Sequence, residues 1–118
     1  MSKLTELVKS GDFKGEKHVP SITVEAVDGG VKILAQVGEE IEHPNTLEHH
    51  IAWIKVFVKP EGSPVPFEVG SYQFAAHGEG EVFSKPEVTA HIKTDKHGEV
   101  YALSYCNIHG LWENTAEF

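Results

Sequence analysis

The sequence predicts an all-β fold: an immunoglobulin-like antiparallel β-sandwich of about seven strands, with a short N-terminal helix. Three observations lead to this fold class. Apolar and polar residues alternate in several short segments, Gly- and Pro-rich turns separate these segments at regular intervals, and helical periodicity is confined to the first residues. A chain of 118 residues fits a single domain, residues 1–118, and is long enough to bury one core.

The N-terminal helix is predicted from Leu4, Leu7 and Val8, which fall at helical spacing, with Gly11 as a candidate C-cap. Beyond it, SITVEAV (21–27) and VKILAQV (31–37) alternate on either side of DGG, which is a hairpin signal. We therefore expect the first two strands to form an antiparallel pair.

The next segment, IAWIKVFV (51–58), is apolar on both faces apart from Lys55, as expected for a strand deep in a sandwich. The Pro- and Gly-rich stretch KPEGSPVP closes it. Three further strands are expected at 71–77 (SYQFAAH), 87–94 (EVTAHIKT) and 100–106 (VYALSYC), and the turns HGEGE and DKHGE separate them.

Charge and composition exclude several classes of protein. Ten Lys and Arg against eighteen Asp and Glu give a net charge of −8, so nucleic acid is not an expected partner. An anionic substrate would need local positive charge to overcome this field. No apolar run reaches the roughly 18 residues of a membrane span, and the charged N-terminus lacks the apolar core of a secretory signal. One cysteine cannot form an internal disulfide, so we expect a cytoplasmic protein without a membrane partner.

Eight histidines are many for a chain of this length, and they give the first indication of a metal. His91 lies on the polar face of its predicted strand, and His77 and His97 lie in turns, so none of these three is expected to be a metal ligand. His49 and His50 are adjacent at the start of a strand and point to opposite faces, so one site can hardly use both.

The remaining candidates lie in three segments. His43 precedes a proline, which restricts it to extended backbone, and His18 lies in EKH, which alone could be a solvated run of charges. Cys106 and His109, with two residues between them, can chelate one ion from a turn. Unpaired cysteines are often simply buried small residues, and that alternative stays open for Cys106 at this point.

Together with His49, these candidates make four histidines and one thiolate, which is too many donors for tetrahedral zinc. A copper site with two histidines and a cysteine usually adds a methionine after the last histidine, whereas the only methionine here is Met1. Imidazole and thiolate together suit iron, and five donors would leave one octahedral position open.

Three segments in order, EKHVP, HPNTLEHHIAWI and SYCNIHGLW, closely resemble the iron-site segments of superoxide reductases, specifically the one-iron neelaredoxin type of the desulfoferrodoxin family. The resemblance runs from about Asp12 to Trp112. Two-iron relatives add a rubredoxin-like module with paired cysteines, which a chain with one cysteine is not expected to carry.

The resemblance implies one Fe(II)/Fe(III) per chain in a mononuclear non-haem centre, with His50 facing away from it. Its implied ligands are four equatorial imidazoles and one axial thiolate: His18, His43, His49, His109 and Cys106. Glu16 would occupy the sixth position of the oxidised iron. Lys17 would supply the positive potential that attracts superoxide and would assist proton delivery.

The implied activity is one-electron, inner-sphere reduction of superoxide to hydrogen peroxide, with the iron re-reduced by an external donor such as rubredoxin. Family members of this type commonly assemble as homotetramers. Two alternatives are a copper or iron electron-transfer protein on a cupredoxin-like sandwich, and a binding module whose metal only stabilises the fold.

Overall fold

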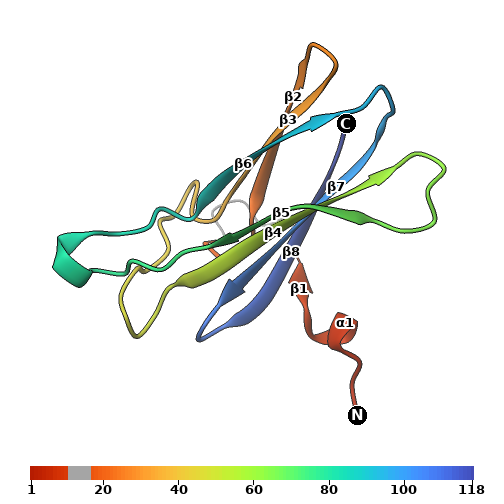
Figure 1. Ribbon diagram of the computed structural model, residues 1–118. Coiled ribbons are helices and arrows are strands. Elements are labelled where there is room, and N and C mark those ends of the chain that lie inside the picture. Colours follow the sequence, from red (N-terminus) through yellow and green to blue (C-terminus); the bar gives the residue numbers. More distant parts are fainter. Residues whose placement is uncertain (11–16) are drawn as a thin grey trace.

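The computed structural model describes residues 1–10 and 17–118, which form two packed β-sheets and a four-residue helix (Figure 1). The helix is α1 (Leu4–Leu7), and a 3₁₀ turn, η1, spans Glu79–Glu81. The strands of the described residues are β1 (Lys9–Ser10), β2 (Ser21–Val27), β3 (Gly30–Gln36), β4 (Ile51–Pro60), β5 (Phe67–Gln73), β6 (Glu87–Lys93), β7 (Gly98–Cys106) and β8 (Gly110–Glu117). The predicted all-β sandwich with a short N-terminal helix is confirmed.

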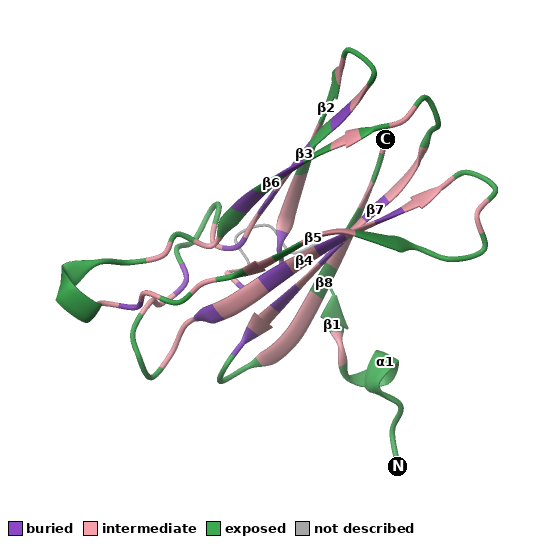
Figure 2. Cartoon of the chain, viewed as in Figure 1, coloured by how far each residue is buried: buried purple, intermediate pink, exposed green. Residues whose placement is uncertain are grey.

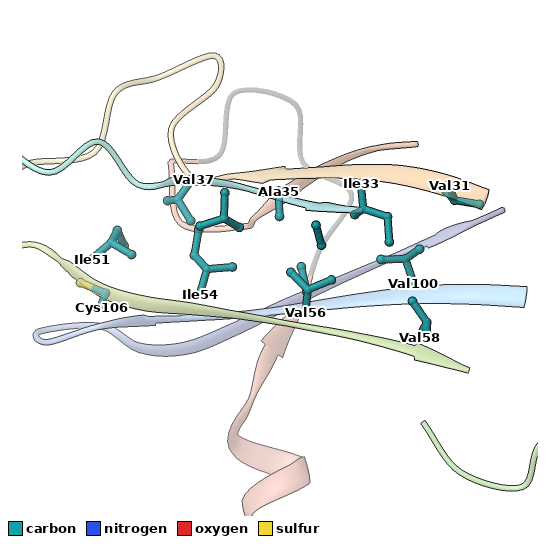
Figure 3. Packing of buried hydrophobic residues seen from close by; sticks show 13 residues of the cluster. Val31, Ile33, Ala35, Val37, Ile51, Ile54, Val56, Val58, Val100 and Cys106 are labelled. Atoms are coloured by element: carbon teal, nitrogen blue, oxygen red, sulfur yellow. The ribbon is translucent and has the colours of Figure 1, made fainter. Parts of the chain in front are cut away.

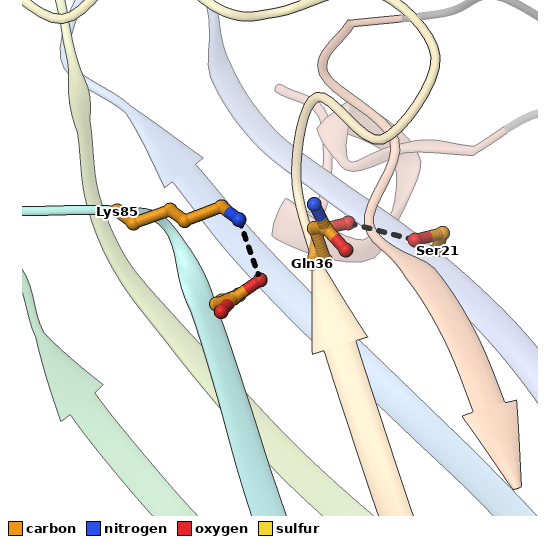
Figure 4. A network of polar contacts seen from close by, with 4 residues as sticks. Ser21, Gln36 and Lys85 are labelled. Atoms are coloured by element: carbon orange, nitrogen blue, oxygen red, sulfur yellow. Dashed lines mark hydrogen bonds and ion pairs between the residues drawn. The ribbon is translucent and has the colours of Figure 1, made fainter.

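The smaller sheet has the order β2-β3-β6, and its hairpin is the one predicted from the sequence. β2 and β3 pair from Ser21↔Gln36 to Val27↔Gly30. Gly29 completes the turn at φ 75°, a left-handed conformation that glycine adopts without strain. At the other end of the pair, the Ser21 hydroxyl donates to the carbonyl of Gln36 at 3.1 Å (Figure 4). An ion pair at 3.3 Å between Lys85 and Glu87 lies at the start of β6.

The larger sheet has the order β1-β8-β7-β4-β5, so β4 lies between two long neighbours. The inward side chains of β4, such as Ile54 and Val56, are fully buried, whereas Trp53 and Phe57 on its other face are half-buried. Strands β4 and β7 pair from Ile51↔Cys106 to Pro60↔Gly98. This long antiparallel ladder places the start of β4 beside the end of β7.

Two strands differ from the sequence prediction. β5 spans Phe67–Gln73 rather than 71–77, because it begins directly after the Pro-rich turn and its pairing with β4 ends at Trp53↔Gln73. β8 was not predicted, because polar residues interrupt its apolar pattern. One of them, Asn114, faces inward and satisfies its amide by donating to the carbonyl of Pro20 at 2.9 Å.

The predicted N-terminal helix is present, but it adds nothing to the core. It ends at Leu7, and Val8 is already extended. Leu4 and Leu7 are 65% and 60% exposed, and the whole of α1 is coloured as exposed in Figure 2. The candidate cap Gly11 lies outside the described residues. None of the helices in the described part of the chain is both long and apolar enough to span a bilayer.

The core lies between the two sheets and reaches the thiol of Cys106 at one end. Its buried members are Val31, Ile33, Ala35, Val37, Ile51, Ile54, Val56, Val58, Val88, Ala90, Val100, Ala102 and Cys106. Cys106 has no exposed surface and lies next to Ile51 at the end of this row (Figure 3). Cys106 is therefore fixed in place by the packing of the core.

Removing core volume at Ile54 should destabilise the whole sandwich. Ile54 is fully buried between the sheets, so Ile54→Ala loses buried apolar surface and leaves a cavity, which costs about 2–5 kcal/mol of unfolding free energy. Ile41 is 51% exposed, and Ile41→Ala should change that free energy by less than about 0.5 kcal/mol. Denaturant titration of both variants measures the difference, and equal stabilities would show that Ile54 does not belong to the core.

Candidate metal centre

Three segments of the chain meet at the end of the sandwich where β7 ends and β4 begins. They are the residues that precede β2, the long connection between β3 and β4, and the β7–β8 turn. Four side chains from these segments form a tight group, in which the nearest nitrogen and sulfur atoms all lie within 4.8 Å of one another: His18, His49, Cys106 and His109. Residues far apart in the sequence are thus gathered as a set of nitrogen and sulfur donors.

His18 is buried and is held by the two strands beneath it. The fully buried hydroxyl of Ser104 on β7 donates to the carbonyl of His18 at 3.2 Å. Asn114 on β8 holds the carbonyl of Pro20, two residues further on. The imidazole stacks on the indole of Trp112, with ring centroids 4.8 Å apart and 14° between the planes. These contacts with the protein therefore fix both the backbone and the ring of His18.

His43 is buried as well, and its ring is oriented by its own backbone. Its Nδ1 lies 2.7 Å from the carbonyl of Pro44, so Nδ1 carries the proton and donates it, and Nε2 keeps a lone pair. The ring meets those of His18 and His49 edge-on, at 4.9 and 4.8 Å between centroids. His43 is not one of the four donors within 4.8 Å, but it borders two of them.

His49 reaches the group from a tight turn with Thr46. The backbone amides of these two residues donate to each other's carbonyls, at 2.9 and 3.2 Å, and the Thr46 hydroxyl adds a second acceptor for the His49 amide. The adjacent His50 points the other way and stacks on His77, with 3.5 Å between centroids and 10° between planes. The predicted opposite orientation of His49 and His50 is confirmed.

Cys106 and His109 are joined by the turn between β7 and β8. The backbone amide of His109 donates to Sγ of Cys106 at 3.4 Å, which is an arrangement that stabilises a thiolate. The ring nitrogen Nδ1 of His109 lies 3.8 Å from this sulfur and 3.0 Å from Nε2 of His18. Cys106 is buried and His109 is exposed, so the group extends from the core to solvent.

The geometry fits a bound transition-metal ion. Two nitrogen ligands at about 2.1 Å from one ion and at right angles to each other are about 3.0 Å apart. That is the separation between Nε2 of His18 and Nδ1 of His109. The Nε2 atoms of His43 and His49 are buried and have no hydrogen-bond partner among the described residues. Leaving such atoms unsatisfied is costly, and a metal ion would satisfy them.

Burial keeps the imidazoles of His43 and His49 neutral, because it lowers the pKa of each ring. Burial lowers the pKa of His43 from 6.5 to about 4; the hydrogen bond to Pro44 opposes this shift, and the neighbours His18, His49 and Lys17 add to it. Burial also lowers the pKa of His49, again with a contribution from Lys17. Both rings are therefore unprotonated at neutral pH, which is the form that coordinates metals.

The other predicted site residues divide into described and undescribed ones. Lys17 is half-buried and directly precedes His18, and its positive charge contributes to the lowered pKa values of His43 and His49. Glu16 lies outside the described residues. His91 and His97 are exposed, and neither belongs to the group of donors. His77 is buried outside that group, where its ring nitrogens face the side chain of Asn45 and the carbonyl of Phe74.

Sequence reasoning missed the residues that support the donors, among them Ser104 and Trp112. A signal for Ser104 was present: it is the polar member of the inward row Val100, Ala102, Ser104 and Cys106. A hydroxyl on a buried face needs a partner. Trp112 gave no comparable signal, because it stacks on His18, a residue near the other end of the sequence.

Comparisons with known proteins show the family of this chain. A model of the desulfoferrodoxin family matches residues 10–115. The chain is 50% identical to the superoxide reductase of Pyrococcus furiosus, over 94% of this chain and 95% of that protein. It is 43% identical to the neelaredoxin of Megalodesulfovibrio gigas, over 96% of this chain and 95% of that protein.

A solved structure resembles the fold over nearly its whole length. It is the superoxide reductase (neelaredoxin) from Archaeoglobus fulgidus in the reduced form, with a TM-score of 0.90 and 46% identity, and the match covers 95% of this chain and 98% of that one. The match to the family model, residues 10–115, includes all three segments that supply the donors. The chain therefore belongs to the desulfoferrodoxin family.

Proposed function

We propose that this protein is a superoxide reductase, which reduces superoxide to hydrogen peroxide by one electron at a single iron. The proposed ligands are the imidazoles and the thiolate predicted from the sequence: His18, His43, His49, His109 and Cys106. The observation that carries this proposal is the meeting of four of these donors within 4.8 Å, next to the unpartnered Nε2 of His43. The names of the relatives support the choice of iron and of superoxide.

The iron, when bound, supplies the electron that superoxide takes up. The protein contributes charge balance: four neutral imidazoles and one thiolate bring a single negative charge to a doubly or triply charged ion, so the site stays positive and attracts an anion. The backbone amide of His109 stabilises the Cys106 thiolate. Exposure of His109 leaves the outer side of the site open to a small molecule from solvent.

Lys17 is proposed to draw superoxide to the site against the net charge of −8. Its ammonium can also donate a hydrogen bond to the reduced product and pass it a proton. Hydrogen peroxide needs two protons, and a half-buried lysine can be reprotonated from water. Glu16, the preceding residue, is proposed to occupy the open position of the oxidised iron, as the family resemblance implies.

Partners follow from the chemistry and from one surface. A single iron gives up one electron for each superoxide, so an external donor must restore it, and we propose a rubredoxin-like protein.

Trp53 and Tyr105 stack at 5.6 Å on the outer face of the larger sheet, and Phe57 is half-buried on that face. We propose a homotetramer, as the family resemblance implies, and these aromatic side chains give this face apolar surface that contact between subunits would bury. A thiolate that must stay reduced supports a cytoplasmic location.

The copper electron-transfer alternative is not favoured. Such a site would normally draw an axial thioether from a nearby methionine. The one methionine of the sequence, Met1, is fully exposed at the N-terminus, where it precedes α1. The number of imidazoles at the site also exceeds the two that this class of copper site uses.

Removing the charge of Lys17 should slow the reaction with superoxide. Lys17→Ala should lower the second-order rate constant about tenfold at low ionic strength, and less at high salt, because steering is screened. Lys32 is exposed on β3, so Lys32→Ala removes the same charge away from the site and should leave the rate near wild type. Stopped-flow or pulse-radiolysis kinetics measure both. Equal rates for the two variants would remove Lys17 from the steering role.

The adjacent histidines provide a matched test of the ligand set. His49→Ala should lose most of the iron and the visible absorption of a ferric–thiolate centre, because one donor and the buried lone pair that it offers are gone. His50→Ala should still bind about one iron per chain, because His50 faces His77. Metal analysis and visible spectra report on both proteins. Iron loss in His50→Ala with retention in His49→Ala would overturn the proposed set.

A further inference from the structure

Asn107, which directly follows Cys106, makes three hydrogen bonds to the turn that carries His49. Its Oδ1 accepts from the backbone amide of His50 at 2.8 Å, and its Nδ2 donates to the carbonyl of Glu48 at 2.9 Å. Its own backbone amide donates to the carbonyl of His50 at 3.2 Å. One side chain thus binds the residues on both sides of His49.

These bonds continue the pairing of β4 with β7 beyond the ends of the two strands. The last regular pair of this ladder is Ile51↔Cys106. The turn of Thr46 with His49 is closed by its own local bonds, and these do not set its position relative to Cys106. The three bonds of Asn107 extend this attachment past the last pair, because they tie Glu48 and His50 to the end of the Cys106 strand.

We propose that Asn107 is a positioning residue, which fixes His49 relative to Cys106 and so preorganises the metal centre. The inference rests on the proposed ligand set, because it assigns a purpose to holding these two donors together. Partners outside the ligand shell that orient ligands typically change metal affinity or activity about 10- to 100-fold when they are removed. A donor held before metal binding also loses less conformational freedom when the metal arrives.

The side chain must be an amide for this role, because it acts as acceptor and donor at once. An aspartate keeps the acceptor for the His50 amide but places a carboxylate against the carbonyl of Glu48. An alanine removes both bonds. The turn to which Asn107 binds is held by further contacts. The His50 ring stacks on His77, and its Nδ1–H donates to the carbonyl of Thr46 at 2.9 Å.

The test compares Asn107→Ala and Asn107→Asp with wild type and with Ser63→Ala as a control. Ser63 also makes two side-chain bonds to backbone, both to Val65, in the turn at the far end of β4. Two readouts are used: amide hydrogen exchange of His50 in the metal-free protein, and the rate at which iron passes to a strong chelator, followed by the ferric–thiolate absorption band.

Asn107→Ala should speed exchange of the His50 amide about fivefold and iron release about tenfold or more, with a shifted or broadened band. Asn107→Asp should protect the His50 amide nearly as well as wild type but still release iron faster. Ser63→Ala should change neither readout. If Asn107→Ala does not fold, Asn107→Asp alone decides through its iron release.

If both asparagine variants released iron at a rate within twofold of wild type, and their absorption band were not shifted, the proposal would be overturned. So would equal changes in Ser63→Ala, because they would reflect general destabilisation. If wild type itself bound iron without a thiolate band, the proposed ligand set would fail. The His50 exchange rates would then still decide whether Asn107 holds this turn to the Cys106 strand.

Discussion

The antiparallel pairing of β4 with β7 is the interaction on which the rest of this site depends. Its register pairs Ile51 with Cys106, and it therefore sets the turn that carries His49 beside the thiol. A shift of this register by one residue would reverse every side chain of β4. Ile54 and Val56 would leave the core, so the same hydrophobic burial that stabilises the sandwich also keeps two donors together.

β7 and the exposed residue that follows it, Asn107, organise the site at the end of the core. Ser104 holds the backbone of His18, Cys106 supplies the sulfur, and Asn107 binds the residues on either side of His49. Each of these contacts spans a long stretch of sequence. The donors lie at the end of the core, where Cys106 is buried and His109 is exposed. Burial also lowers the pKa of an imidazole in this region, that of His43.

Local patterns in the sequence predicted much of the fold and part of the site. The β2–β3 hairpin and the opposite orientations of His49 and His50 follow from short-range rules, and the structure has both. The alternation in the strand marks Ser104 as a buried polar residue, but the partner of Ser104 and of Trp112, His18, is distant in sequence and does not follow from local rules. β8 was missed for a related reason: its inward Asn114 is satisfied only by a partner, Pro20, that is distant in sequence. The ligand set itself was predicted from family resemblance, and it stays a prediction.

We propose above all that these imidazoles and the thiolate hold an iron ion that gives superoxide one electron and releases no dioxygen. Pulse radiolysis of the reduced, iron-loaded protein tests this most directly, with peroxide measured after each burst of superoxide. We expect a fast decay to the ferric form and one hydrogen peroxide for each superoxide and each ferrous ion consumed. A ferrous protein that did not react with superoxide, or one peroxide for every two superoxide with the iron unchanged, would contradict it.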